Sequence, residues 1–308
     1  MKKKKTRKKG FCHQILRCWQ LYVLLLPTII YFLIFNYAPM VGIQIAFRDY
    51  KVSKGFWESA WVGLKHFKTF LEAYQLPTLI ENTVKISVYS LIWGFPIPII
   101  LALLLNESKS QKLKKVVQTL TYAPYFISTV VLVAMLSMFL SPSTGVINKM
   151  IEFLGGTAYD FMGSASAFRP VYIISGIWQG AGWSSIIYVA GLAGIDPQLL
   201  EAAEIDGANR FQKIWHVNLP GIMPIVVIQL IMSCGGILGV GYEKVYLMQN
   251  TLNQSVSEVI STYVYKMGLL NAQYSYTTAI GLFNTVINLA ILLIVNQICK
   301  KVSEVSLF

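Results

Sequence analysis

Long stretches without a charged side chain dominate the pattern of hydrophobic and polar positions along the chain. An α-helix rises about 1.5 Å per residue, so about 20 apolar residues cross a hydrocarbon core about 30 Å thick. Six stretches without Asp, Glu, Lys or Arg reach this length: Cys18 to Phe47, Ile86 to Asn106, Val116 to Asn148, Pro170 to Ile195, Ile214 to Tyr242 and Met267 to Cys299. They predict an all-α polytopic membrane protein with six transmembrane helices.

Two other architectures fit these stretches less well. Buried helices of a large soluble protein rarely run so long without charge, and they are accompanied by polar partner helices that this sequence lacks. Strands of an outer-membrane barrel are about ten residues long and alternate in polarity, whereas these stretches are longer and do not alternate. Only 13% of the 308 residues are charged, against about 25% in soluble domains.

The apolar stretches define one membrane domain over 19–308, preceded by a basic tail over 1–18. We expect its helices at about 19–41, 84–105, 119–141, 171–193, 221–242 and 277–299. A secretory signal has an apolar segment of about 7 to 15 residues and a cleavage site of small residues. The first stretch here is longer and ends in NYAPMVGIQ, so we expect it to remain as the first helix.

The formal charge of +12 indicates how the helices are oriented. With a cytoplasmic amino terminus, 16 of the 26 Lys and Arg residues lie on the internal flanks 1–18, 106–120, 194–220 and 300–308. Nine lie on the longer external segments 42–81, 142–170 and 243–275. The positive-inside rule describes such a bias. Both termini are therefore predicted to be cytoplasmic, and nucleic acid is not needed to explain the charge.

A polar stretch over 196–220 interrupts the apolar pattern between the fourth and fifth helices, on the predicted cytoplasmic side. Asp196 followed by Pro197 is typical of a helix start, because Asp caps free amides and Pro suits the first turn. Gly207 tolerates the backbone angles that end this first short helix, and a second is expected to begin at about Ala208. Small alanines beside carboxylates suit a groove in another protein. An amphipathic helix on lipid is the alternative, which the carboxylates disfavour.

The other motifs favour neither catalysis nor an autonomous channel. No P-loop or nucleophile-elbow spacing occurs, and the four cysteines and three histidines form no metal-ligand cluster. The spacing of Gly235 and Gly239 in CGGILGVGYEK predicts close packing of a continuous fifth helix rather than a potassium-type filter. The apolar stretches contain no Asp, Glu, Lys or Arg for ion coupling, which disfavours an ATP-independent channel or secondary transporter.

The polar stretch also carries a recognisable order of residues. Glu201-Ala202-Ala203 is followed after three residues by Gly207, after nine more by Val217, and after one more by Leu219-Pro220. This order resembles the signature loop of the membrane permeases of binding-protein-dependent ABC importers, with Val in place of Ile as the one departure. FNYAPMVGIQIAFRDYK, WVGLKHF and ISTYVYKMGLLNAQYSYTTAIGLF further resemble the polysaccharide and multiple-sugar branch, so the similarity covers nearly the whole chain.

The resemblance implies a permease subunit of an ATP-driven importer in the bacterial cytoplasmic membrane, which translocates a carbohydrate, expected to be an oligosaccharide, by alternating access. Its implied partners are a second, different permease, two ATP-binding subunits and an extracellular solute-binding protein, expected to be a lipoprotein. ATP and Mg would be bound by the ATPase subunits, and this chain would hold no cofactor, metal or catalytic residue. An importer of another solute class, such as amino acids or metal ions, is the alternative within the family.

The resemblance also assigns roles to residues. The polar stretch would be the coupling element that docks in an ATPase cleft, through Leu200, Glu201, Ala202, Ala203, Asp206, Gly207, Ala208, Leu219 and Pro220. Glu201 would be the ionic anchor, Ala202 and Ala203 the contact surface, and Gly207 the turn.

Candidates for the sugar path are polar and aromatic residues near the membrane midplane, because sugars are held by hydrogen bonds and aromatic faces. These are Tyr89, Trp93, Tyr125, Trp178, Gln179, Trp183, Asn284 and Asn288. For each of them a hydrogen bond between helices or an interfacial anchor is the alternative role.

Overall fold

A computed structural model describes residues 19–303 and 305–307, so the basic tail predicted over 1–18 lies outside the described residues. Within the described part, four helices are long and apolar enough to cross a membrane: Trp19–Phe47, Leu76–Glu107, Arg210–Gly235 and Tyr274–Ser303. Two bent pairs raise the number to six if each counts as one span: Gln111–Phe126 with Thr129–Phe139, and Ala165–Ala193 with Pro197–Ile205. The prediction of an all-helical chain with several apolar spans is confirmed.

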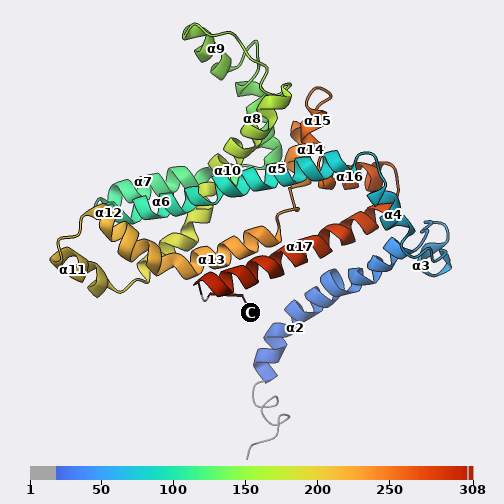
Figure 1. Cartoon of the computed structure of the whole chain (residues 1–308), viewed down its shortest axis with the longest axis horizontal. Coiled ribbons are helices and arrows are strands. Elements are labelled where there is room, and N and C mark those ends of the chain that lie inside the picture. The colour runs from blue at the N-terminus through green and yellow to red at the C-terminus, as the bar shows by residue number, and fades with distance from the viewer. Residues whose placement is uncertain (1–18, 304, 308) are drawn as a thin grey trace, which may run out of the picture.

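The helical segments follow one another with short connections (Figure 1). The first half comprises α2 (Trp19–Phe32), η1 (Leu33–Tyr37), η2 (Ala38–Phe47), α3 (Gly55–Glu58), α4 (Lys65–Leu71), α5 (Leu76–Gly94), α6 (Pro96–Glu107), α7 (Gln111–Tyr122), η3 (Ala123–Phe126), α8 (Thr129–Phe139) and α9 (Val146–Phe153). The second half comprises α10 (Ala165–Ala193), α11 (Pro197–Ile205), α12 (Arg210–Lys213), η4 (Ile214–Asn218), α13 (Leu219–Gly235), α14 (Tyr242–Met248), α15 (Gln254–Ser257), α16 (Ile260–Tyr265), η5 (Lys266–Leu270) and α17 (Tyr274–Ser303).

The long helix α10 organises the bundle. It packs against α5, α6, α7 and α13, while α17 packs against α13, η2 and α4. Figure 1 shows α5 and α6 along one side and α13 beside α17 along the other. Buried Ile99, Tyr188 and Ile222 join α6, α10 and α13 in one apolar cluster. Residues on α10 therefore face several helices at once.

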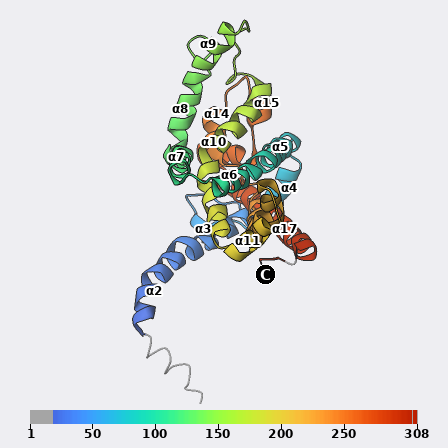
Figure 2. The same ribbon diagram turned by 90° about the vertical axis from the view of Figure 1, so that its left-hand side faces the viewer.

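The segment from α8 to α9 projects away from the bundle (Figures 1 and 2). Asn148, which is 1% exposed, stabilises its tip. Its side chain donates to the carbonyl oxygens of Ser141 and Tyr159 (both 3.0 Å) and accepts from the Tyr159 amide (2.8 Å). These bonds satisfy the backbone of the connections on both sides of α9 and fix the shape of the projection.

The helix expected over 119–141 is broken in the structure. Its two parts, Gln111–Phe126 and Thr129–Phe139, meet at 101°. Pro124 lies in the turn η3 and has no amide to continue the helix. Ser128 then starts α8 by accepting a hydrogen bond from the Val131 amide (3.4 Å). The sequence shows one continuous apolar stretch here because apolar residues lie on both sides of the bend.

The helix expected over 221–242 also differs, because α13 already ends at Gly235. Gly235 does lie in close contact with Leu292 on α17, as the small-residue spacing predicts, whereas Gly239 lies beyond the helix. Residues 236–241 form a non-helical connection to α14. A glycine-rich stretch favours a break where other helices supply partners for the backbone.

The expected helices at 84–105, 171–193 and 277–299 are longer in the structure. They belong to Leu76–Glu107, Ala165–Ala193 and Tyr274–Ser303. The extra turns are more polar; in Leu76–Glu107, for example, the added residues include Glu81, which pairs with Lys85 at i+4. An apolar pattern marks only the part of a helix that suits hydrocarbon, so it underestimates the full helix.

We expect Gly182→Ala to destabilise the protein, because Gly182 on α10 is buried and a Cβ there would overlap the backbone carbonyl of Thr121 on α7. Overpacking of this kind costs about 1–3 kcal/mol, which lowers the midpoint of thermal unfolding by several degrees. Gly180→Ala is the matched control, since it lies on the same helix and its Cβ would meet nothing within 4 Å. Equal midpoints for the two variants in detergent would contradict close packing of α7 on α10.

Candidate functional site

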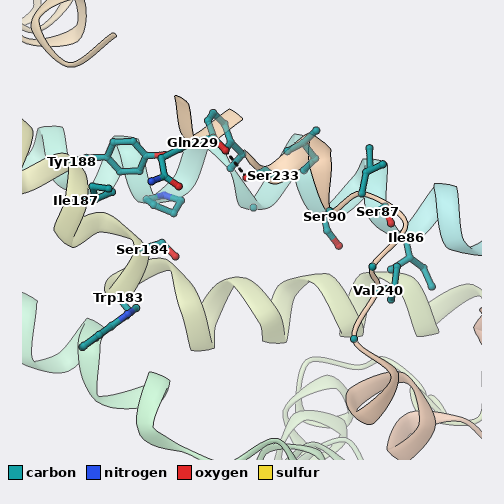
Figure 3. Close-up of a pocket in the computed structure, with 18 of the residues that line it drawn as sticks. Ile86, Ser87, Ser90, Trp183, Ser184, Ile187, Tyr188, Gln229, Ser233 and Val240 are labelled. Atoms are coloured by element: carbon teal, nitrogen blue, oxygen red, sulfur yellow. Dashed lines mark hydrogen bonds between the residues drawn. The ribbon is translucent and has the colours of Figure 1, made fainter. Parts of the chain in front are cut away.

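A cavity of about 890 Å³ lies between α5, α6, α10 and α13. Its wall is mostly apolar, with polar groups that include Ser87, Ser90, Ser184, Gln229 and Ser233. Figure 3 shows Ser90 and Ser184 on facing helices at the cavity, with Gln229 and Ser233 along another wall. The Ser87 hydroxyl is buried and has no hydrogen-bond partner among the described residues. A buried polar group without a partner is a candidate ligand contact.

A smaller cavity of about 330 Å³ adjoins the first and shares with it Ser90, Gly94, Pro98, Tyr172 and Ser184. It extends along α10 past Gly176 and Gln179, and Lys244 of α14 also lines it. The two cavities together offer apolar surface, aromatic rings and scattered hydroxyl and amide groups. Such a mixture suits a polar organic solute that also has apolar faces.

Two of the residues predicted for the sugar path line these cavities. Trp183 borders the larger one and Gln179 the smaller one. The Tyr125 ring stacks on Trp183 with centroids 4.6 Å apart and planes 5° apart, so it packs against a residue of the cavity wall. Gln179 donates its amide to the Ile127 carbonyl oxygen at the break between α7 and α8 (2.8 Å). Gln179 therefore supports the backbone at this break and also lines the smaller cavity.

Of the other predicted path residues, Asn284 lines a third cavity, of about 500 Å³, between α14, α16 and α17. Tyr89, Trp93 and Trp178 are 42%, 62% and 49% exposed, respectively, and none of them lines the three described cavities. Asn288 accepts from the Leu238 amide (3.1 Å) and Asn284 donates to the Leu238 carbonyl oxygen (3.3 Å). Both asparagines thus make a hydrogen bond between elements, which was the alternative role, and Asn284 does so while it lines the third cavity.

Sequence reasoning missed the serines and the glycine-rich wall. Small polar residues such as Ser87, Ser90 and Ser184 are common in membrane helices, where they also pack between helices, so the sequence alone does not mark them. The non-helical residues 236–241 supply Gly236, Ile237, Gly239, Val240 and Gly241 to the wall. Clustered glycines ahead of a charged Glu243-Lys244 pair are the signal that could have indicated a break here.

The segment 196–220 folds as two short helices joined by a turn. The Asp196 side chain accepts from the Gln198 amide (2.9 Å) and starts α11, as predicted. Gly207 has φ +76°, a left-handed conformation that glycine adopts without a steric penalty. Asn209 and Gln212 form a reciprocal capping box with bonds of 2.9 and 2.7 Å, so α12 begins at Arg210 rather than at about Ala208. The capping side chain decides this boundary.

An ion pair between Lys213 and Glu204 (2.7 Å) holds the two short helices together. Glu204 is therefore engaged within the segment, whereas Glu201 and Asp206 are exposed. Ile205 and Phe211 are 87% and 84% exposed. The element thus presents one available carboxylate surface beside large apolar side chains.

The base of this element is joined to the bundle. The Asn218 side chain donates to the Glu107 carboxylate at the end of α6 (3.0 Å). Leu219 and Pro220 form the first turn of α13, where Pro needs no hydrogen-bond partner for its nitrogen. The predicted docking residues Leu200 to Ala208 thus project from the bundle, while Leu219 and Pro220 lie at its edge.

Comparison with known proteins gives the family of this chain. The family model described as "Binding-protein-dependent transport system inner membrane component" matches residues 94–304. The chain belongs to this family. Binding-protein-dependent transport components of this type are integral proteins of the bacterial inner membrane and are transport subunits rather than enzymes.

Relatives cover nearly the whole of this inner-membrane component. The polygalacturonan/rhamnogalacturonan transport system permease protein YteP of Bacillus subtilis (strain 168) is 43% identical over 305 residues, 99% of this chain and 95% of the relative. A crystal structure of a bacterial ABC transporter involved in the import of the acidic polysaccharide alginate has a TM-score of 0.88 at 42% identity, covering 96% of this chain and 100% of that chain.

A second structure of the alginate transporter, in complex with an alginate pentasaccharide-bound periplasmic protein, is also similar. It has a TM-score of 0.88 at 41% identity and covers 97% of this chain and 100% of that chain. At this identity and coverage, this chain and the alginate transporter chain share the whole fold.

We expect Asn288→Leu to destabilise the wall of the larger cavity. The substitution leaves the Leu238 amide without its acceptor, and Leu238 is 6% exposed. An unsatisfied buried amide costs about 1–3 kcal/mol, so the thermal unfolding midpoint should fall. Thr285→Val is the control, because this exposed hydroxyl on the same helix bonds only the Gly281 carbonyl oxygen of its own helix. If both variants unfold at the wild-type temperature, Asn288 does not hold the wall.

Proposed function

We propose that this chain forms one half of the membrane pathway of an ABC importer, which carries an oligosaccharide inward by alternating access. The chain is a permease of the sugar and polysaccharide importer type. The carbohydrate assignment is supported by the substrates named for its relatives, which are polygalacturonan, rhamnogalacturonan and alginate. The mixed apolar and hydroxyl lining of the cavities suits such a substrate.

The observation that carries the proposal is the exposed element α11–α12, with its turn at Gly207. Figure 1 places it at one end of the bundle, opposite the end that bears α3 and α4. Leu199, Ile205 and Phe211 are exposed there, and a surface of this kind fits the groove of a partner protein better than water. The element follows the signature order from Glu201 to Pro220.

Six spans with both termini in the cytoplasm fit this role. The count follows if each bent pair crosses the membrane once. The surplus of Lys and Arg on the flanks that would then be internal supports this orientation. In this orientation α11–α12 would lie in the cytoplasm, on the same side as the proposed ATPase subunits.

The partners in this proposal are a second, different permease, two ATPase subunits that bind ATP and Mg, and an extracellular solute-binding protein. The most apolar part of the span Trp19–Phe47 is not buried in this chain, so that part is available for lipid and for a second permease. ATP favours the closed ATPase dimer, and a ligand that binds one global state better shifts the population toward that state. The coupling element would transmit this shift to the cavities.

We expect Glu201→Lys and Gly207→Pro to abolish capture of the ATPase subunit when the tagged chain is pulled down from native membranes. Glu201→Lys reverses the charge of the anchor, and Gly207→Pro is incompatible with φ +76°. Mass spectrometry should find the second permease with the wild type and both variants, and the ATPase with the wild type alone.

Glu152→Lys on α9 is the matched control, because it reverses an exposed carboxylate on a part of the chain that Figure 1 shows far from α11. It should retain the ATPase. Retention of the ATPase by all three variants would mean that α11–α12 is not the docking site, and absence of any ATPase from the wild-type sample would overturn the importer proposal.

A further inference from the structure

Lys244 places a positive charge at the cavities. It lies in the first turn of α14, directly after the non-helical wall 236–241, and lines the smaller cavity. Its Nζ donates to the Tyr172 carbonyl oxygen (2.9 Å) and lies 4.7 Å from the centre of the Tyr172 ring. Among the residues that line the three described cavities, it is the one with a charged side chain.

No carboxylate of the described residues forms an ion pair with this ammonium group. The ion pairs among the described residues involve other lysines, namely Lys68, Lys85, Lys213 and Lys266. The neighbouring Glu243 is exposed. A lysine has three N–H donors, and the Tyr172 carbonyl takes one of them. Donors therefore remain for a ligand in the cavity.

The surrounding structure makes room for the ammonium group of Lys244. A Cβ on Gly176 would lie 3.3 Å from the Lys244 Nζ, so glycine at this position lets the ammonium group approach α10. Burial lowers the pKa of Lys244 to about 8, which leaves it mainly protonated at pH 7. A partly buried cation without an anionic partner is costly, and such residues in membrane proteins usually mark a substrate or ion path.

The groups near Lys244 define the kind of anion that fits. Ser90, Ser184 and Gln179 supply hydroxyl and amide groups in the same cavity, and Tyr172 and Trp183 supply aromatic rings to the larger one. Sugar rings use both kinds of contact. One cation among neutral groups matches one carboxylate per sugar residue, as in a uronic acid, rather than a multiply charged phosphate.

We propose that Lys244 binds the carboxylate of a uronic-acid residue in the translocation cavity and makes this permease selective for acidic oligosaccharides. The inference rests on the proposed function, because it takes the cavities as the sugar path. The competing role for Lys244 is structural: it would only join α14 to α10 through the Tyr172 carbonyl. A structural role affects every substrate alike, whereas carboxylate recognition affects acidic ones.

The test uses the complete transporter, with its own second permease, ATPase and solute-binding protein, in proteoliposomes. The probes are trigalacturonate and its fully methyl-esterified form, which has the same length and stereochemistry without the charge. Initial rates of ATP-driven uptake are measured at saturating loaded binding protein for the wild type, Lys244→Met and Lys244→Arg. Since all three use the same binding protein, any discrimination by that protein cancels when the acid-to-ester ratios are compared.

We expect Lys244→Met to lower the acid-to-ester uptake ratio about tenfold or more, because a charge-assisted hydrogen bond to the carboxylate is lost. Lys244→Arg should restore most of the ratio. An equal fall in both rates for Lys244→Met, or an unchanged ratio, overturns the proposal in favour of the structural role. A lower thermal unfolding midpoint for Lys244→Met with an unchanged acid-to-ester ratio also shows that Lys244 has only the structural role.

The wild-type rates separate this inference from the proposed function. Uptake of neutral oligosaccharides without uptake of trigalacturonate overturns the role of Lys244 and leaves the importer intact. If no carbohydrate of either charge is taken up and the loaded binding protein does not stimulate ATP hydrolysis, the proposed function itself fails.

Discussion

Backbone groups at membrane depth need hydrogen-bond partners, and the arrangement of this protein depends on how two helix breaks obtain them. Beyond Gly235, Asn284 and Asn288 bind both polar groups of the Leu238 backbone. At the bend between α7 and α8, Gln179 binds the Ile127 carbonyl. Each break is thus satisfied by a side chain from a neighbouring helix, so irregular backbone is tolerated inside the bundle.

The cavities lie beside these breaks. The non-helical residues 236–241 leave the path that a continuous α13 would follow and form part of the larger cavity's wall. They also lead directly into α14 and so place Lys244 against α10. A regular fifth helix would place Lys244 elsewhere, and the charge at the smaller cavity is therefore a consequence of the break.

Helices α10 and α13, which line the larger cavity, also connect it to α11–α12. Helix α10 bears Trp183 and Ser184 and continues through Gly194 to Asp196 into α11. On the other side, α12 continues through η4 into α13, which bears Gln229 and Ser233. The Glu204–Lys213 ion pair joins the two short helices, so in the proposed function a displacement of this element reaches two walls of the cavity together. The connection is direct because α10 leads into α11 and α12 leads into α13.

The sequence by itself determined the apolar spans and the helix–turn–helix at 196–220, because both depend on local properties. Hydrophobic length is read along the chain, and Asp196-Pro197 and Gly207 act on their own neighbouring backbone. The signature order from Glu201 to Pro220 is likewise a local pattern, and it indicated the family that the comparisons confirm.

Only the tertiary structure decided where the helices break and which side chains meet at the cavities. Gln179 and Ile127 are 52 residues apart in the sequence, and Asn288 and Leu238 are 50 apart, so neither pairing has a local signal. For the same reason the sequence did not show that Trp183 lies at a cavity, that Asn288 supports backbone, and that Gln179 and Asn284 do both. An amide or an aromatic ring in an apolar helix can serve either role, and the role is set by the neighbours that packing brings to it.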